Sequence, residues 1–566
     1  MSTPDPVHFD YSAALDPARS AVVEACAGSG KTWLLASRIV RLLLAGAAPA
    51  EILAITFTRK AAREIEERVV DWLRELATAD DAAVRRFLVE RGAAADAATV
   101  AAARGLYERV TGAQPGLAVN TFHGWFLQLV AVAPLSANLA GATLADDGSR
   151  RFEELWQGFA RRLQRDKESP AAQAFVRLLA GIGLASTRTL LRQGMARRAE
   201  WLAMGADVDA ALAEIRQRFG VDCEGEALAA FFAAGWEAEV QAYLGFLAAS
   251  ELASDQGFAA QLASLFGEVD LARRLAVLAS VLLTEKGGLR SRKPSKALDK
   301  RLGAENAQRF LDLHGALGAR VQACLAQLQE ERNFAFNRDA LLVHAAFLAH
   351  LDAFKAERRQ IDFIDAEWRV LELLRDEASA AFIQARLDAR YKHVLLDEFQ
   401  DTNPLQWQIL LAWLEAYTDA LRPSVFLVGD PKQSIYRFRR AEPRLFSAAA
   451  DFLTERFDAV RLAQDDTRRN APAIVDVVNE LFAAEALFQP FRRQGSLASG
   501  VPGRVELLPL FGGEAEADVA GAPAGLRDPL RTPAVERIDS RRHDEAAAMA
   551  AKLEGLLGRL QVRDGD

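Results

Sequence analysis

A glycine-rich segment that could cradle a phosphate, ACAGSGKT, occupies Ala25–Thr32 between an apolar run and an amphipathic helical pattern. Small residues let successive backbone N–H groups wrap around a phosphate, and a helix that begins there adds partial positive charge. Lys31 would reach the β- and γ-phosphates of a nucleotide, and Thr32 would hold Mg²⁺. The usual pattern has glycine where Ala25 stands, and the alternative is a glycine-rich turn without a ligand. We therefore expect ATP and Mg²⁺ as cofactors, bound by Ala25, Cys26, Ala27, Gly28, Ser29, Gly30, Lys31 and Thr32.

Two adjacent carboxylates end a second apolar run, VLLDE. A phosphate-loop enzyme needs a carboxylate at the end of a neighbouring strand to hold Mg²⁺, and a further residue to orient the attacking water. We assign the first role to Asp397 and the second to Glu398. The alternative is a solvated helix start, where Asp and Glu are common. That alternative leaves the apolar run before the carboxylates unexplained.

The elements around these segments predict an α/β fold with a parallel sheet. Strand patterns at 21–25 and 51–57 alternate with helical patterns at 31–46 and 59–76. Strand patterns return at 393–398 and 424–430. The region between has helical periodicity and few strand signals, which predicts an inserted helical domain at 136–388. We expect a first α/β domain formed by 1–135 and 389–461, and the beginning of a second at 462–566.

The composition bounds the class of protein. The chain has 566 residues, a net charge of −8, and three cysteines too far apart in sequence to form a disulfide framework. We see no signal peptide and no apolar run near the ~18 residues of a membrane span, and we expect a cytoplasmic protein without a membrane partner. The net charge does not exclude nucleic acid, which needs only a local basic groove. Near the C-terminus we expect a strand at 504–510 and a helix at 544–560.

The residues that follow the two carboxylates, and four further segments, make this pattern more specific. DEFQDT resembles the second motif of UvrD/Rep-like superfamily 1 DNA helicases. Segments similar to that family's motifs Ia, Ib, III and IV lie in the order the family requires, at Ile52–Ile65, Val119–Phe126, Val425–Glu442 and Asp466–Phe482. GDPKQSIYRFR and Ile361–Leu374 resemble the RecB/AddA branch of helicase–nuclease subunits. The resemblance implies a RecA-like P-loop NTPase sheet with a large helical insertion and the start of a second RecA-like domain.

The resemblance also implies roles for single residues. Gln433 would contact the γ-phosphate or its water, and Arg469 would act as an arginine finger. Tyr436 and Phe438 would stack on single-stranded DNA, and Arg439, with Lys432, would meet its phosphates. Core packing is the ordinary alternative for such aromatic residues. Further strand contacts are implied for the matching positions of motifs Ia and Ib, namely Phe57, Thr58, Phe122 and His123, although the two phenylalanines equally fit the sheet core.

Two departures from the family and one basic stretch are left open by the sequence. The position before Arg469, usually aromatic, is Arg468, and residues 1–30 contain no glutamine for adenine recognition. A guanidinium plane can also stack on a base. The basic stretch Thr284–Gly303 could hold duplex DNA through phosphate contacts, or it could be a solvated loop.

The resemblance implies ATP-dependent 3′→5′ DNA translocation and unwinding in recombination and double-strand break repair. We find no segment similar to motifs V and VI, or to a nuclease domain, before Asp566, so we expect a truncated motor. The alternative is a module that binds ATP and DNA but does not unwind unless missing domains or a partner complete it. A phosphate-loop ATPase unrelated to nucleic acid conflicts with motifs Ia, Ib and III together. Expected partners are single-stranded and duplex DNA and a second helicase–nuclease subunit.

Overall fold

The computed structural model describes residues 7–134, 142–145, 149–220, 225–233, 235–418, 422–485, 491–498, 500–511 and 541–559. The predicted domain boundary at residue 136 lies outside these ranges. The chain divides into two compact units. We call them the α/β unit (Met1–Thr121, Arg390–Pro404 and Tyr417–Asp566) and the helical unit (Phe122–Ala389 and Leu405–Ala416). The finer domain boundaries expected from the sequence stay predictions.

The α/β unit is built on a seven-stranded parallel sheet in the order β1-β9-β2-β8-β7-β3-β4. The strands are β1 Val7–His8, β2 Ala21–Ala25, β3 Ile52–Thr56, β4 Ala118–Thr121, β7 His393–Leu396, β8 Ser424–Gly429 and β9 Val460–Gln464. The predicted α/β fold with a parallel sheet is confirmed. The boundary predicted at Leu462 falls inside β9, which pairs with β2 from Ala21 to Ala25.

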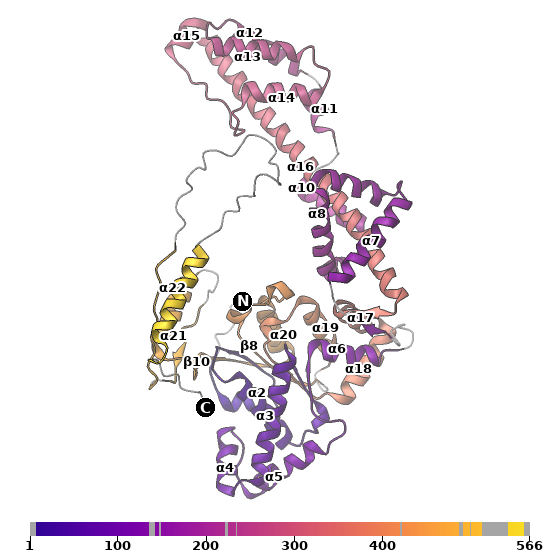
Figure 1. The fold of residues 1–566 in the computed structure, drawn as a ribbon, viewed down its shortest axis with the longest axis vertical. Coiled ribbons are helices and arrows are strands. Elements are labelled where there is room, and N and C mark those ends of the chain that lie inside the picture. The colour runs from indigo at the N-terminus through magenta and orange to yellow at the C-terminus, as the bar shows by residue number, and fades with distance from the viewer. Residues whose placement is uncertain are drawn as a thin grey trace. The chain divides into compact units, whose positions relative to one another are not determined.

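Helices cover both faces of this sheet, as its almost uniformly buried strands require. One face carries α2 Lys31–Leu44, α3 Arg59–Thr78 and α5 Ala97–Thr111, whose apolar stripes share a core with the alternate strand residues Val23, Ala54, Leu395 and Phe426. The short helices α1 Tyr11–Leu15 and α4 Asp81–Glu90 complete this core. Against β8, β2 and β9 also lies α20 Arg444–Phe457. Figure 1 shows α2, α3, α4 and α5 side by side in the indigo part of the chain.

The helical unit is organised around one very long helix, α16 Ala304–Glu357, 54 residues long. Two separate apolar cores lie along it, one near Phe310 and Leu317 and the other near Phe347 and Leu351. The first core is completed mainly by α12 Trp236–Ala248, α13 Ala253–Leu265 and α14 Leu271–Leu282, and the second by α7 Ser149–Arg165 and α8 Pro170–Ala196. The other helices among the described residues of this unit are α6 Phe122–Ala131, α9 Arg198–Ala203, α10 Val208–Phe219, α11 Ala227–Phe231, α15 Lys296–Leu302, α17 Phe363–Arg375, α18 Glu377–Arg390 and α19 Pro404–Leu414. The predicted helical insertion is therefore present.

Among the described residues, α8 is long and apolar enough on average to cross a membrane. The sequence shows no long apolar run here because Arg177 and Arg188 interrupt it. The helix is also broken at Gly183, whose φ of 76° and ψ of 168° are not helical. Arg177 pairs with Asp339 on α16 at 2.7 Å, so this helix packs as part of the helical unit. A single helix of this kind is weak evidence for a membrane span.

The C-terminal part of the α/β unit contains β10 Asp466–Thr467 paired with β11 Gly495–Ser496, then α21 Pro472–Ala483 and α22 Arg541–Leu556. The prediction of a strand at 504–510 is wrong: the described residues of this segment form none. Its apolar side chains are not packed away: Leu507 is 91% exposed and Leu510 97% exposed. The described ranges offer no neighbouring strand to pair with it, so its strand propensity has no ladder to complete.

Candidate nucleotide and nucleic-acid site

The phosphate loop lies where the sequence predicted it, between β2 and α2. Gly28 (φ +76°) and Gly30 (φ +96°) both take left-handed backbone conformations, which glycine adopts without steric cost. The Ser29 hydroxyl donates to the Cys26 carbonyl oxygen at 2.8 Å and fixes the turn. No side chain caps Gly30 at the start of α2. The first N–H groups of α2 therefore remain available to an anion.

The two predicted carboxylates follow β7 and face the loop lysine. Glu398 Oε2 lies 3.2 Å from Lys31 Nζ. The buried Asp397 accepts a hydrogen bond from Thr56 Oγ1 at 3.3 Å through Oδ2. Burial, together with the nearby charge of Glu398, raises the pKa of Asp397 to about 7, although Lys31 opposes the shift. Glu398 holds a left-handed backbone (φ 48°, ψ 44°), an uncommon conformation for a residue with a side chain.

Several polar atoms at this site are buried without a hydrogen-bond partner among the described residues. They include Asp397 Oδ1 and Asp401 Oδ1. Burial also raises the pKa of Asp401 to about 6, with Glu398 adding to the shift. Buried polar atoms without partners are rare in native folds and call for a ligand or ion. The donor set of Thr32 and Asp397 fits Mg²⁺, which takes oxygen ligands and is held by one or two carboxylates with substrate phosphates.

A chain of hydrogen bonds joins the ends of β7 and β8, and Gln400 is its centre. Gln400 Nε2 donates to Glu398 Oε2 at 2.6 Å, and Gln400 Oε1 accepts from the Asp430 backbone N–H at 2.9 Å. Asp430 in turn accepts from Gln433 Nε2 at 2.7 Å. The sequence marked Gln400 only as part of a motif. In the structure its side chain orients Glu398.

Lys432, expected from the sequence to meet DNA phosphates, is instead paired inside the α/β unit. Its Nζ lies 2.7 Å from Glu24 Oε1 and 3.2 Å from Asp430 Oδ1. Arg492 completes the network, 3.1 Å from Glu24 and 2.9 Å from Asp465. The expectation for Lys432 is therefore corrected: its charge is neutralised by carboxylates of the sheet.

In the loop itself, burial raises the pKa of the Cys26 thiol to about 11, so Cys26 acts as a small filler.

The motif IV arginines lie directly on the phosphate loop. The Arg468 backbone N–H donates to the Gly28 carbonyl oxygen at 2.9 Å, and the Arg468 guanidinium donates to the Tyr11 hydroxyl at 3.1 Å. Gln464 Nε2 also donates to this hydroxyl, at 3.0 Å. The residues around the small hollow here are Phe9, Tyr11, Ala25, Ser29, Gly30, Lys31, Trp33, Leu34 and Gln464. Gln464 is far along the chain from residues 1–30, and β9 brings it to this hollow.

An aromatic cluster lies at the ends of β3 and β8. The ring centroids of Phe57 and Tyr436 are 4.6 Å apart, and those of Tyr436 and Phe438 are 5.7 Å apart. The Arg439 guanidinium lies within 5.3–5.7 Å of all three rings. Phe438 is 78% exposed. The cluster thus presents an exposed ring and a cation side by side.

The remaining predicted contact residues differ in exposure. The Thr58 hydroxyl caps α3 by accepting from the Ala61 N–H at 3.0 Å, which gives it a structural role. Phe122 is buried against Phe126, in agreement with the core-packing alternative. His123, in contrast, is 39% exposed.

The basic stretch Thr284–Gly303 divides into two sets of cations. Three arginines are used internally: Arg290 donates to the Ser280 carbonyl oxygen, and Arg292 and Arg301 pair with the buried Asp255. The lysines of the stretch are exposed at 286, 293, 296 and 300. The arginines thus fix the loop and the lysines face solvent.

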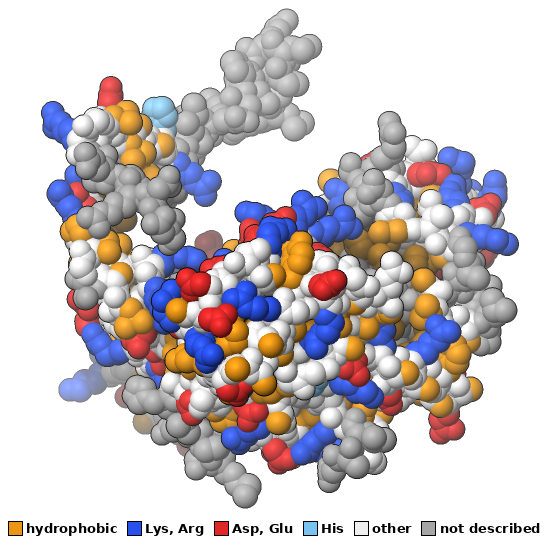
Figure 2. All heavy atoms as spheres, turned by 90° about the horizontal axis from the view of Figure 1, so that it is seen from below, with side chains coloured by type: hydrophobic (Ala, Val, Ile, Leu, Met, Phe, Trp, Pro, Cys, Tyr) orange, Lys and Arg blue, Asp and Glu red, His pale blue; other side chains and the backbone are white. Residues whose placement is uncertain are grey.

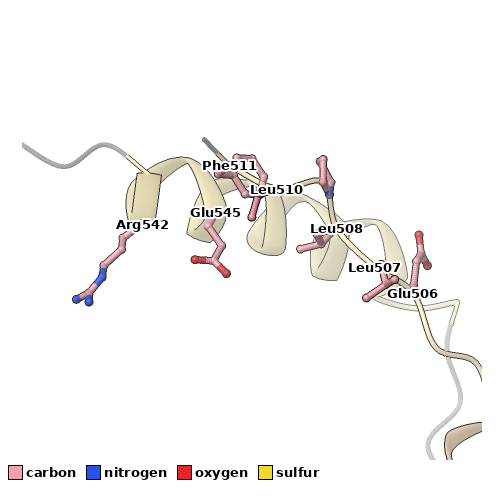
Figure 3. Close-up of a pocket in the computed structure, with 8 residues that line it drawn as sticks. Glu506, Leu507, Leu508, Leu510, Phe511, Arg542 and Glu545 are labelled. Atoms are coloured by element: carbon pink, nitrogen blue, oxygen red, sulfur yellow. The ribbon is translucent and has the colours of Figure 1, made fainter. Parts of the chain in front are cut away.

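Figures 2 and 3 show the surface charge of one face and a hollow outside this site. On the face shown in Figure 2, Lys and Arg side chains are interspersed with Asp and Glu, so no single sign of charge covers it. Figure 3 shows a hollow between the segment before residue 512 and α22, lined by Glu506, Leu507, Leu508, Pro509, Leu510, Phe511, Arg542 and Glu545. It contains none of the predicted site residues.

Comparison with known proteins finds several relatives that share one name. A protein of Levilactobacillus brevis, named as the A subunit of an ATP-dependent helicase/nuclease, is 28% identical over 465 residues, covering 76% of this chain and 34% of that protein. The protein of the same name from Desulforudis audaxviator is 27% identical over 600 residues, covering 95% of this chain and 45% of that protein. The counterpart from Natranaerobius thermophilus is 39% identical over 132 residues, covering 23% of this chain and 10% of that protein. The chain thus spans between a tenth and just under half of these relatives' lengths.

The sequence model of the UvrD/REP helicase N-terminal domain matches residues 10–453. This range contains the phosphate loop, both carboxylates, the aromatic cluster and the helical unit. The chain therefore belongs to the UvrD/Rep helicase family.

Proposed function

We propose that this chain is the ATP-binding motor part of a 3′→5′ DNA translocase and helicase that acts in recombination and double-strand break repair. The observation that carries the proposal is the pairing of Lys31 with Glu398 at the phosphate loop, beside a buried Asp397 whose Oδ1 has no hydrogen-bond partner among the described residues. A lysine and two carboxylates in this arrangement suit phosphoryl transfer to water.

Each side chain has a distinct task in the proposed hydrolysis. Thr32 and Asp397 would hold Mg²⁺, which when bound with ATP supplies charge neutralisation at the phosphates. Lys31 would leave Glu398 and bind the phosphate oxygens. Glu398, then held by Gln400 alone, would orient the attacking water and accept its proton. Gln433 would sense the γ-phosphate, and Arg469 would stabilise transition-state charge.

The DNA would bind along the aromatic cluster. Phe438 and Tyr436 offer faces on which bases of any sequence can stack, which suits a motor that moves along a strand. Arg439 would attract the phosphates. Gln433 and Tyr436 belong to one short segment. A shift of Gln433 toward a γ-phosphate would therefore also displace Tyr436 at the DNA contact.

The second candidate is a module that binds ATP and DNA without unwinding. It is favoured by the fraction of the relatives' length that the chain covers. Unwinding would then require further domains or a second helicase–nuclease subunit. We place the protein, together with that subunit, in the cytoplasm. The exposed lysines of Thr284–Gly303 are candidates for duplex contacts in either case.

DNA-stimulated ATP hydrolysis and strand displacement by the 566-residue chain separate these candidates. Hydrolysis that rises with single-stranded DNA and is lost in Lys31→Ala supports the motor assignment. Strand displacement by the chain alone would exclude the module, and nucleotide and DNA binding without displacement would favour it. Hydrolysis that is indifferent to DNA contradicts both.

A further inference from the structure

The segment Ile361–Leu374 has no role in the proposed chemistry, yet a capping box and several ion pairs fix its position. It contains all of α17 except the last residue, and the N-terminus of this helix is closed by a reciprocal capping box between Asp362 and Asp365. Lys355 donates to both oxygens of Asp365, at 2.6 and 2.7 Å, and Arg198 pairs with both aspartates. Lys355 and Arg198 are themselves buried. Buried charges persist only when paired, so this network fixes the position of the first turn of α17.

From this fixed helix, Glu367 points at His123 near the start of α6. Glu367 is 2% exposed, and its Oε1 lies 3.3 Å from His123 Nε2. The same oxygen accepts a hydrogen bond from Gln406 Nε2 on α19 at 2.7 Å. A buried carboxylate is tolerated where donors satisfy it, and here the donors come from α6 and α19. The carboxylate therefore ties three helices of the helical unit together.

The imidazole of His123 is oriented from a second side by Phe363. Their ring centroids are 4.4 Å apart with an interplanar angle of 58°. Both side chains remain more than a third exposed. An Nε2–H that donates to Glu367 selects the tautomer of the ring and leaves Nδ1 as the atom for an outside partner.

We propose that Glu367 is a positioning residue for single-stranded DNA, acting through His123, with Phe363 as the neighbouring stacking surface. This inference rests on the proposed function, because it assumes that the chain binds a DNA strand. The partner chemistry is a phosphate or base edge that meets the imidazole beside an exposed aromatic ring. Gln406 extends the arrangement to α19, the helix that follows the catalytic carboxylates closely along the chain.

The test is a double-mutant cycle on the 566-residue chain with a fluorescein-labelled oligothymidylate as the probe. His123→Ala and Glu367→Ala are each expected to weaken DNA binding about tenfold, and the double variant no further, because both remove the same contact. Glu367→Gln keeps an acceptor oxygen of the same shape and should restore most of the affinity. Binding of a fluorescent ATP analogue should not change in any of them.

Glu372→Ala is the matched control, since Glu372 lies on the same helix but accepts from Trp368 and Arg369. Additive losses in the double variant, or equal losses of DNA and nucleotide binding in Glu367→Ala, would overturn the proposal. Normal DNA binding by His123→Ala and Glu367→Ala, together with poor DNA binding by Phe438→Ala, would also overturn the proposal. The proposed function would then remain supported. Absence of DNA binding by the unaltered chain contradicts the proposed function itself.

Discussion

Arg468 and Gly28 are joined through their main chains, with the Arg468 N–H donating to the Gly28 carbonyl oxygen at 2.9 Å. A Cβ at Gly28 would lie 2.5 Å from Arg469 Cβ and 2.6 Å from Thr467 Oγ1. The motif IV segment therefore sits against the phosphate loop with no room between them. A conformational change that moves the motif IV segment must therefore also move the phosphate loop or break the contact between the two.

Gly28→Ala should separate the motif IV segment from the loop and weaken nucleotide binding at least about tenfold, because the new methyl overlaps backbone-anchored atoms. Titration with a fluorescent ATP analogue measures this. Gly46→Ala is the control: Gly46 also has a positive φ, +100°, but nothing lies within 4 Å of its added Cβ. It should cost about 1–2 kcal/mol of stability at most and leave affinity intact. Equal affinities for both variants would refute the close contact.

Glu398→Gln should abolish most ATP hydrolysis while the nucleotide still binds, because a general base contributes about 10²–10⁴ in rate. Glutamine keeps an oxygen for Gln400 but cannot accept a proton at neutral pH. Single-turnover hydrolysis and analogue binding, measured side by side, check this. Lys31→Ala, in contrast, should lose binding as well as turnover. A Glu398→Gln enzyme with near-normal turnover would remove Glu398 from the catalytic role.

Phe438→Ala should weaken binding of single-stranded DNA by roughly 5- to 150-fold, because a base–aromatic stack contributes about 1–3 kcal/mol. Fluorescence anisotropy with a labelled oligonucleotide measures it. Phe382→Ala is a close control, since Phe382 is also an exposed ring with an arginine over it, Arg386 at 4.9 Å. If both variants bind DNA normally, the aromatic cluster is not the strand-binding surface.

His393 provides a pH-dependent contribution to stability. Burial, together with the nearby charge of Arg38, lowers its pKa to about 4, although Glu51 opposes the shift. Above pH 6.5 both folded and unfolded states hold the ring neutral, so its contribution is fully present. As the pH falls from 6.5 toward 4, only the unfolded state takes up the proton, and stability on the order of 2–3 kcal/mol is lost.

Asp397 and Asp401 act in the opposite direction. Their raised pKa values, about 7 and 6, mean that stability is gained as the pH falls through that range. The unfolding curve of the unaltered chain therefore mixes both effects, and the difference from His393→Asn isolates the histidine. The introduced amide can keep a hydrogen bond to Ser424, whose Oγ lies 2.7 Å from His393 Nδ1. The stability difference should shrink from pH 7.5 to pH 5. A stability difference that stays constant between pH 7.5 and pH 5 would contradict this assignment.

The parts of the site that the sequence predicted are local. The phosphate loop and the carboxylates after β7 each combine a buried strand with a polar turn in one short segment, and both were found. The contacts of Gln400, Gln464 and Glu367 depend on residues brought together by the sheet and by helix packing, so no spacing reveals them. β9 was missed, and the strand at 504–510 was wrongly expected, because strand formation depends on neighbours that a local pattern does not contain.

The strand order also sets when the nucleotide site can exist during synthesis. β2, which carries the phosphate loop, pairs with β8 and β9 and not with β3. In a nascent chain that ends before Ser424, the phosphate loop is attached to β2 while neither neighbouring strand has been synthesised. The long first segment of the helical unit, Phe122–Ala389, has already been synthesised at that point. Pairing across so long an interval is slow and exposes apolar edges. Folding of the ATP site is therefore a late event, and a ribosome-bound chain will acquire nucleotide affinity only after β9 has emerged.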